Sequence, residues 1–114
     1  GLPPFVRREF VPLARTRAFI EDVRRGIFDE YVGEYRFERR PGLVVSITRR
    51  GDSLISEAGG QRNLLVSLDD GSLLTSHYDG EGRFRRNRRG KVTHLVYYEF
   101  GRRLGIARKT RIAG

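Results

Sequence analysis

The stretch PGLVVSITRRGDSLISEAGGQ, residues 41–61, sets the pattern that most of the chain follows. Two runs rich in Val, Ile and Leu are bounded by short glycine-containing pairs typical of hairpin turns: Pro41-Gly42, Gly51-Asp52 and Gly59-Gly60. In the first run, Leu43, Val45 and Ile47 fall on alternate positions, as in a strand that buries one face. The stretch therefore predicts two antiparallel strands joined by a tight turn.

Turn signals continue at near-even spacing beyond this stretch, at Asp70-Gly71, Asp79-Gly80, Arg89-Gly90 and Gly101. Regular turns between short apolar runs are typical of an antiparallel sandwich or barrel. One inward face per strand favours a meander rolled around one core, so we expect an all-β, eight-stranded, up-and-down antiparallel barrel. The predicted strands are 31–40, 43–50, 53–58, 62–68, 72–78, 82–87, 91–100 and 103–111.

The first part of the chain has a different pattern. Pro12 suits a first helical position, and no helix breaker follows until Gly26. Apolar residues at helical spacing form one stripe opposite charged ones. We therefore divide the chain into an N-terminal arm and amphipathic helix, 1–29, and a barrel, 30–114. The helix either packs on the barrel or docks onto another domain or a second copy.

Composition excludes some classes of site. The 114 residues are enough for one domain and include no cysteine, which excludes disulfides, thiolate metal sites and a cysteine nucleophile. We find no apolar run long enough to span a membrane and no secretory leader. The net charge of +9 points to acidic partners, but arginine supplies 21 of the 23 basic residues, a bias also typical of GC-rich coding.

The stretch YVGEYRF, residues 31–37, is expected to be the first barrel strand, with Tyr31, Gly33, Tyr35 and Phe37 pointing inward. Glycine there permits sharp coiling and the close approach of another segment. In a closed meander the last strand lies beside the first. Arg108 is then placed to stack on Tyr31 or Tyr35 and to close the barrel by a cation–π contact.

These features, together with GKVTHLVYYEFGRRLGIARK at 90–109, resemble a lipocalin-like domain of unknown function. That domain is often found at the C-terminus of serine β-lactamase-like (penicillin-binding-protein-like) hydrolases. Family members close with Ala, any residue and then Arg, whereas here Ala107 is followed by Arg108 and Lys109, so the closing arginine can be shifted. The resemblance implies a non-catalytic accessory or interaction module. Its partner would be a hydrolase domain, in a periplasmic or other extracytoplasmic setting; a free-standing protein would be cytoplasmic.

No catalytic constellation accompanies the resemblance. The hydrolases use a Ser-x-x-Lys nucleophile, and no serine here has lysine three residues later. His77, Asp79 and Glu81 could offer three metal ligands, but Asp79 also belongs to an ordinary hairpin turn. We therefore predict no enzyme activity, metal or cofactor.

Two further functions stay open. An eight-stranded barrel can hold one small ligand, and an apolar or anionic one could be lined by Ser56, Thr75, His77 and Tyr97, although we expect aromatic side chains to fill the interior. A polyanion-binding protein is the third candidate. Nucleic acid is not favoured, because the arginine clusters divide between the two barrel ends and do not alternate with exposed aromatic residues.

Overall fold

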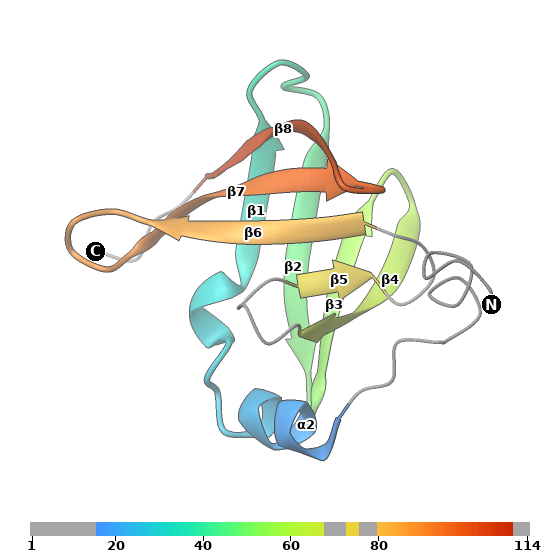
Figure 1. Ribbon diagram of the computed structural model, residues 1–114, viewed down its shortest axis with the longest axis vertical. Helices are drawn as coiled ribbons and strands as arrows, with labels where there is room; N and C mark the ends of the chain where they lie inside the picture. The colour runs from blue at the N-terminus through green and yellow to red at the C-terminus, as the bar shows by residue number, and fades with distance from the viewer. Residues whose placement is uncertain (1–15, 68–72, 76–79, 111–114) are drawn as a thin grey trace, which may run out of the picture.

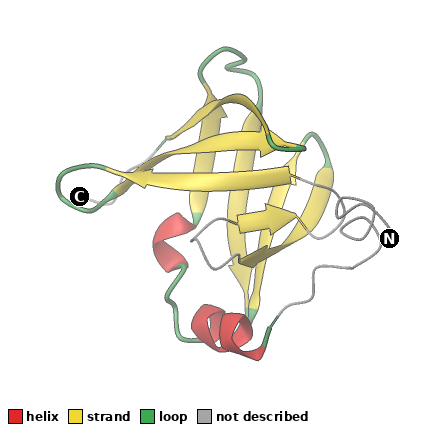
Figure 2. Ribbon diagram, in the orientation of Figure 1, coloured by secondary structure: helices red, strands yellow, loops and turns green. Residues whose placement is uncertain are grey.

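The computed structural model describes residues 16–67, 73–75 and 80–110 (Figure 1). The described chain is mostly β, with one short α-helix (Figure 2), which confirms the all-β class. No described helix is long and apolar enough to cross a membrane. The elements are α2 (Arg17–Arg24), the 3-10 helix η1 (Asp29–Tyr31), β1 (Gly33–Phe37), β2 (Val44–Arg50), β3 (Ser53–Ala58), β4 (Gln61–Ser67), β5 (Leu73–Thr75), β6 (Gly80–Arg86), β7 (Val92–Glu99) and β8 (Arg102–Lys109).

The strands form one strongly curled antiparallel sheet in which each pairs with the next along the chain (Figure 1). β8 also pairs with β1, where Tyr35 lies opposite Lys109 and Phe37 opposite Ala107. The ladder is thinnest at β5, which has three registered pairs with β4 and two with β6. Around most of its circumference the wall is therefore well paired, and its weakest section lies at β5.

Several predicted boundaries are wrong. β1 begins at Gly33, because Tyr31 ends the preceding 3-10 turn and does not extend the strand. The helix begins at Arg17, where the Thr16 side chain accepts a hydrogen bond from the Phe19 backbone N–H at 3.1 Å. This N-cap satisfies a donor that the first helical turn leaves without a backbone partner. The position proposed for the helix start, Pro12, lies outside the described residues.

The helix covers the barrel end that carries the β2–β3 turn. Its apolar stripe is directed inward, and Phe19 and Val23 are buried in the barrel core. Arg49 of β2 holds the segment in place by donating to Asp29 at 3.0 Å and to the Arg24 carbonyl at 3.1 Å. Of the two predicted roles for the helix, the structure shows packing on its own barrel.

Aromatic rings fill this end of the interior. Phe28 lies between Phe19 and Tyr31, with ring centroids 5.3 and 5.8 Å away. Tyr31 stacks on Phe84 at 4.3 Å, and Tyr35 meets the same ring edge-on at 5.7 Å. The Tyr35 hydroxyl donates to the Tyr31 carbonyl at 2.8 Å, so the buried phenol keeps a partner. The expectation of an aromatic-filled interior is correct for this end.

The predicted closure by Arg108 is wrong. Arg108 lies on the outer face of the sheet, where it is exposed and pairs with Glu38. Lys109, one residue later, crosses Gly33: a Cβ atom added there would lie 2.8 Å from the lysine Cε. The lysine Nζ donates to the Glu30 carbonyl at 2.8 Å. Gly33 is thus required by a close approach, as expected, but the approaching side chain is Lys109.

The cation over Tyr31 comes instead from β6. The Arg86 guanidinium lies 5.7 Å from the Tyr31 ring centroid and also pairs with Glu30. The cation–π contact predicted for the first strand therefore exists with a different arginine, because Tyr31 lies before the strand and faces the β6–β7 hairpin.

Candidate ligand-binding site

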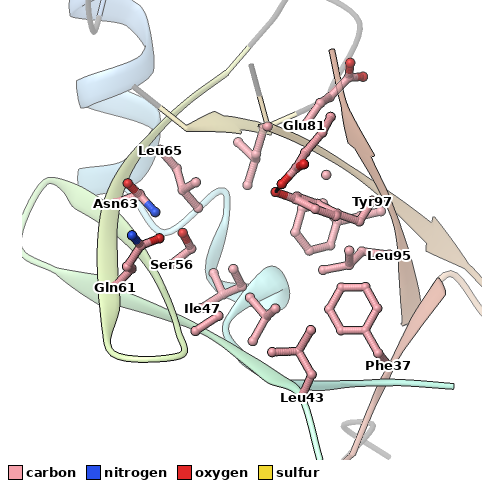
Figure 3. A pocket seen from close by; sticks show the side chains of 17 residues that line it. Phe37, Leu43, Ile47, Ser56, Gln61, Asn63, Leu65, Glu81, Leu95 and Tyr97 are labelled. Atoms are coloured by element: carbon pink, nitrogen blue, oxygen red, sulfur yellow. Dashed lines mark hydrogen bonds between the residues drawn. The ribbon is translucent and has the colours of Figure 1, made fainter. Parts of the chain in front are cut away.

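The opposite end of the barrel, near the β1–β2, β3–β4 and β7–β8 turns, is hollow. A cavity of about 210 Å³ opens there (Figure 3). Its lining comes from seven of the strands and the residue before β2: Phe37, Leu43, Val45, Ile47, Ser56, Ala58, Gln61, Asn63, Leu65, Leu73, Gly80, Glu81, Gly82, Phe84, Leu95, Tyr97 and Glu99. The interior is therefore filled at the helix end only, and the expectation of a wholly filled barrel is wrong.

The body of the cavity is apolar. Ile47, Leu65, Leu73 and Leu95 are buried and form its floor, because they belong to the same core as the aromatic end. The Phe37 ring forms part of the side wall and meets the Tyr97 ring edge-on at 6.1 Å. An apolar body with a few placed polar groups is the usual composition of a small-molecule site.

A glycine on β8, Gly105, leaves room for the Phe37 ring. A Cβ atom added at Gly105 would lie 3.4 Å from the Phe37 Cδ1, so a larger residue there would press on the ring. Gly105 lies opposite Tyr97 in the β7–β8 ladder. One strand position therefore leaves room for the aromatic ring that shapes the cavity wall.

Polar groups lie on two sides of this body. On one side, β3 and β4 bring together Ser56, Gln61 and Asn63, with Ser56 opposite Asn63 in the ladder (Figure 3). On the other, the Tyr97 hydroxyl donates to the Glu99 carboxylate at 2.9 Å. The first group offers both donors and acceptors, whereas the second brings a negative charge.

Glu81 is a further carboxylate at the cavity. Its side chain is only 15% exposed and pairs with Arg83 at 2.5 Å. Arg83 in turn lies over the Tyr98 ring, 4.8 Å from its centroid. The positive charge that neutralises Glu81 therefore lies toward the outer face of β6 and β7.

Two of the four predicted ligand-binding residues line the cavity: Ser56 and Tyr97. The Thr75 backbone pairs with Leu65 in the β4–β5 ladder, and His77 lies outside the described residues. Sequence reasoning missed Gln61 and Glu99. Both are polar residues at strand ends beside a turn, and such residues usually face solvent.

The described residues contain no group of three or more His, Asp or Glu side chains that could hold a metal ion. Two of the proposed ligands, His77 and Asp79, lie outside the described residues. His94 is on the outer face of β7 and shares a hydrogen bond with the neighbouring Thr93 hydroxyl at 2.9 Å.

No protein-family model, curated protein or solved structure matched this chain.

Proposed function

We propose that this chain is a lipocalin-like module that binds a small ligand in the open end of its barrel. The proposal rests on one observation: aromatic side chains fill one end of the interior, while the other end keeps a cavity of about 210 Å³. A dry cavity of roughly 150 Å³ lined by aliphatic and aromatic side chains can hold a benzene ring. The volume is therefore suited to one substituted ring or a short branched chain.

The charges at the cavity favour a neutral or cationic ligand. Glu99 and Glu81 both line the cavity, and only Glu81 has a described ion-pair partner. Burying an anion beside an uncompensated carboxylate is costly, whereas an amine or hydroxyl donor would be stabilised. Of the predicted apolar or anionic ligands, we retain the apolar one, with a hydrogen-bond donor directed at Glu99.

Native mass spectrometry of the protein as purified, before and after denaturation, tests whether a ligand is retained. A mass excess that denaturation removes supports the proposal. A ligand-observed NMR screen of single-ring amines, alcohols and carboxylates then tests its chemistry. We expect amines and alcohols to bind and carboxylates to fail.

A matched pair of variants locates the binding. Ser56→Leu fills part of the cavity, and Ser46→Leu makes the same change on the adjacent strand, at a position whose side chain lies outside the cavity lining. We expect the first variant to lose the NMR hits and the second to keep them. If both variants bind like the unmodified protein, or if no compound of any class binds, the cavity is not a ligand site.

A second proposal is the accessory role implied by the resemblance, with a serine hydrolase domain as partner or self-association. The feature that favours it is an exposed apolar surface around the β7–β8 turn, where Phe100 is 75% and Leu104 50% exposed. The helix suits this role less, because Phe19 and Val23 of its apolar stripe are buried in the barrel core. Phe100→Ser should weaken self-association or binding to a hydrolase domain, as measured by sedimentation velocity. An unmodified chain that stays monomeric and does not bind an added hydrolase domain would argue against this role.

A further inference from the structure

The outer face of the sheet carries a row of basic side chains that the strand register builds. Arg85 of β6 lies opposite His94 of β7, His94 opposite Arg108 of β8, and Arg108 opposite Arg36 of β1. Adjacent strands lie about 4.8 Å apart, so the four positions span roughly 15 Å in a line. The row therefore combines Arg36 of the first strand with residues of the last three strands.

These four side chains point outward because their neighbours along each strand are core residues. Tyr35 and Ala107 are fully buried, and Leu95 is nearly so. Arg36 and Arg85 are exposed, and the Arg108 side chain is 59% exposed. The guanidinium groups of the row are therefore accessible to a partner.

Few carboxylates neutralise the positive charge of this row. Among the described residues, Glu38 pairs with Arg108, and no carboxylate pairs with Arg36 or Arg85. The exposed Glu34 lies on the same face as Arg36, two residues before it, at the edge of the row. Like charges directly opposite each other destabilise a sheet. A bound anion would relieve this repulsion.

The β6–β7 turn adds to this positive surface. Arg88, Arg89 and Lys91 are exposed there, and the hairpin extends away from the rest of the sheet (Figure 1). The Asn87 side chain accepts from the backbone N–H groups of Arg89 and Lys91 at 2.9 and 3.0 Å, which fixes the shape of the turn. We group the row with the adjoining turn under the name basic face: Arg36, Arg85, Arg88, Arg89, Lys91, His94 and Arg108.

We propose that the basic face binds the phosphate backbone of a nucleic-acid duplex. A linear set of guanidinium groups suits phosphates, which arginine recognises with paired N–H donors. Single-strand binders also present aromatic side chains for base stacking. Among the described residues, Phe100 is the strongly exposed aromatic one, and it lies at the opposite end of β7. The structure therefore points to sequence-independent backbone contacts with a duplex.

His94 makes this binding pH-dependent. Burial, then the charges of Arg108 and Arg85, lower its pKa, and Glu38 opposes them. Phosphates would favour the protonated ring, so a bound duplex should raise the His94 pKa. Affinity should accordingly increase as the pH falls toward this pKa.

The test is fluorescence anisotropy of a labelled DNA duplex of about 20 base pairs, titrated with protein at several salt concentrations. Non-specific binders have Kd values of about 10⁻⁴–10⁻⁶ M at physiological salt, and affinity falls steeply as salt rises. The test variant is the triple substitution Arg36→Gln, Arg85→Gln and Arg108→Gln. Its control, Arg17→Gln, Arg50→Gln and Arg102→Gln, removes the same charge from exposed positions elsewhere.

We expect the test variant to lose at least about tenfold in affinity and about two to three units of salt slope, since each phosphate contact contributes close to one unit. The control should change by less than about twofold. Circular dichroism should show both variants folded. An NMR titration of the histidine ring protons should show the His94 pKa rising when duplex is added to the unmodified protein.

Three results would overturn the proposal. Equal losses in the two variants would mean that net charge alone drives binding. Absence of duplex binding at about 50 mM salt would exclude a nucleic-acid site. Binding to vesicles containing phosphatidylserine without binding to duplex would assign the basic face to a membrane surface instead.

Discussion

Gly33→Ala tests the account of how β1 and β8 meet. The glycine has φ 148°, a conformation that costs other residues about 1–3 kcal/mol. A Cβ atom would also lie 2.8 Å from Lys109 Cε, so the lysine must move and lose its hydrogen bond to the Glu30 carbonyl, worth about 1 kcal/mol. We expect the free energy of unfolding to fall by about 2–4 kcal/mol, which lowers the Tm by roughly 10 °C for a chain of this size.

Urea denaturation of a double-mutant cycle separates the two contributions. In a Lys109→Ala background the collision is absent, so Gly33→Ala should cost only its backbone part, about 1–3 kcal/mol. Gly42→Ala is the control, because its added Cβ meets nothing within 4 Å and its φ is not positive. A loss below about 0.5 kcal/mol for Gly33→Ala, or the same loss in both backgrounds, would refute the role given to Lys109.

Three further predictions concern the filled end of the barrel. Burial, then the Tyr31 charge, raises the pKa of Tyr35. Because the unfolded phenol ionises near pH 10, the stabilisation from neutral Tyr35 should be fully present below that pH and be lost as the pH rises above it. Tyr35→Phe should therefore flatten the decline of the urea midpoint with rising pH. Arg49→Gln breaks the hydrogen bonds to Asp29 and the Arg24 carbonyl, so amide hydrogen exchange in α2 should accelerate severalfold while β7 amides stay protected. Equal acceleration in α2 and β7 would show that Arg49 does not hold the helix locally. Thr16→Ala should cost about 1 kcal/mol by loss of the N-cap, and Thr16→Ser should restore most of it in the same assay.

The sequence predicted the strands well where turn chemistry and alternation agree. The strand 53–58 has the predicted bounds, because Gly51-Asp52 and Gly59-Gly60 fix both of its ends. Tyr31 was misplaced because alternation continues from Tyr31 to Phe37, whereas the chain before Gly33 is in a 3-10 turn. Local pattern does not reveal where a turn ends if the turn residues happen to match the strand period.

The cavity was less predictable, for a physical reason. Its volume depends on which side chains fill the interior. Most of the interior aromatic residues gather at the helix end, whereas Phe37 and Tyr97 line the cavity. Composition alone does not reveal that asymmetry. Likewise, the basic face depends on pairing Arg108 with His94 and with Arg36, and Arg36 lies far from Arg108 in the sequence. The register of the strands, rather than any local motif, brings them together.

Because the barrel is filled at one end and hollow at the other, substitutions at the two ends should have different effects on stability. Substitutions at the helix end act on a packed core, where lost methylene groups directly reduce stability. Substitutions at the polar wall residues Ser56, Gln61 and Asn63 remove fewer packing contacts, because these residues face the cavity and lie outside the buried core. We therefore expect the cavity walls to tolerate sequence change while the fold persists. Such a chain could acquire a new ligand preference by a few mutations and would be a practical scaffold for engineered receptors.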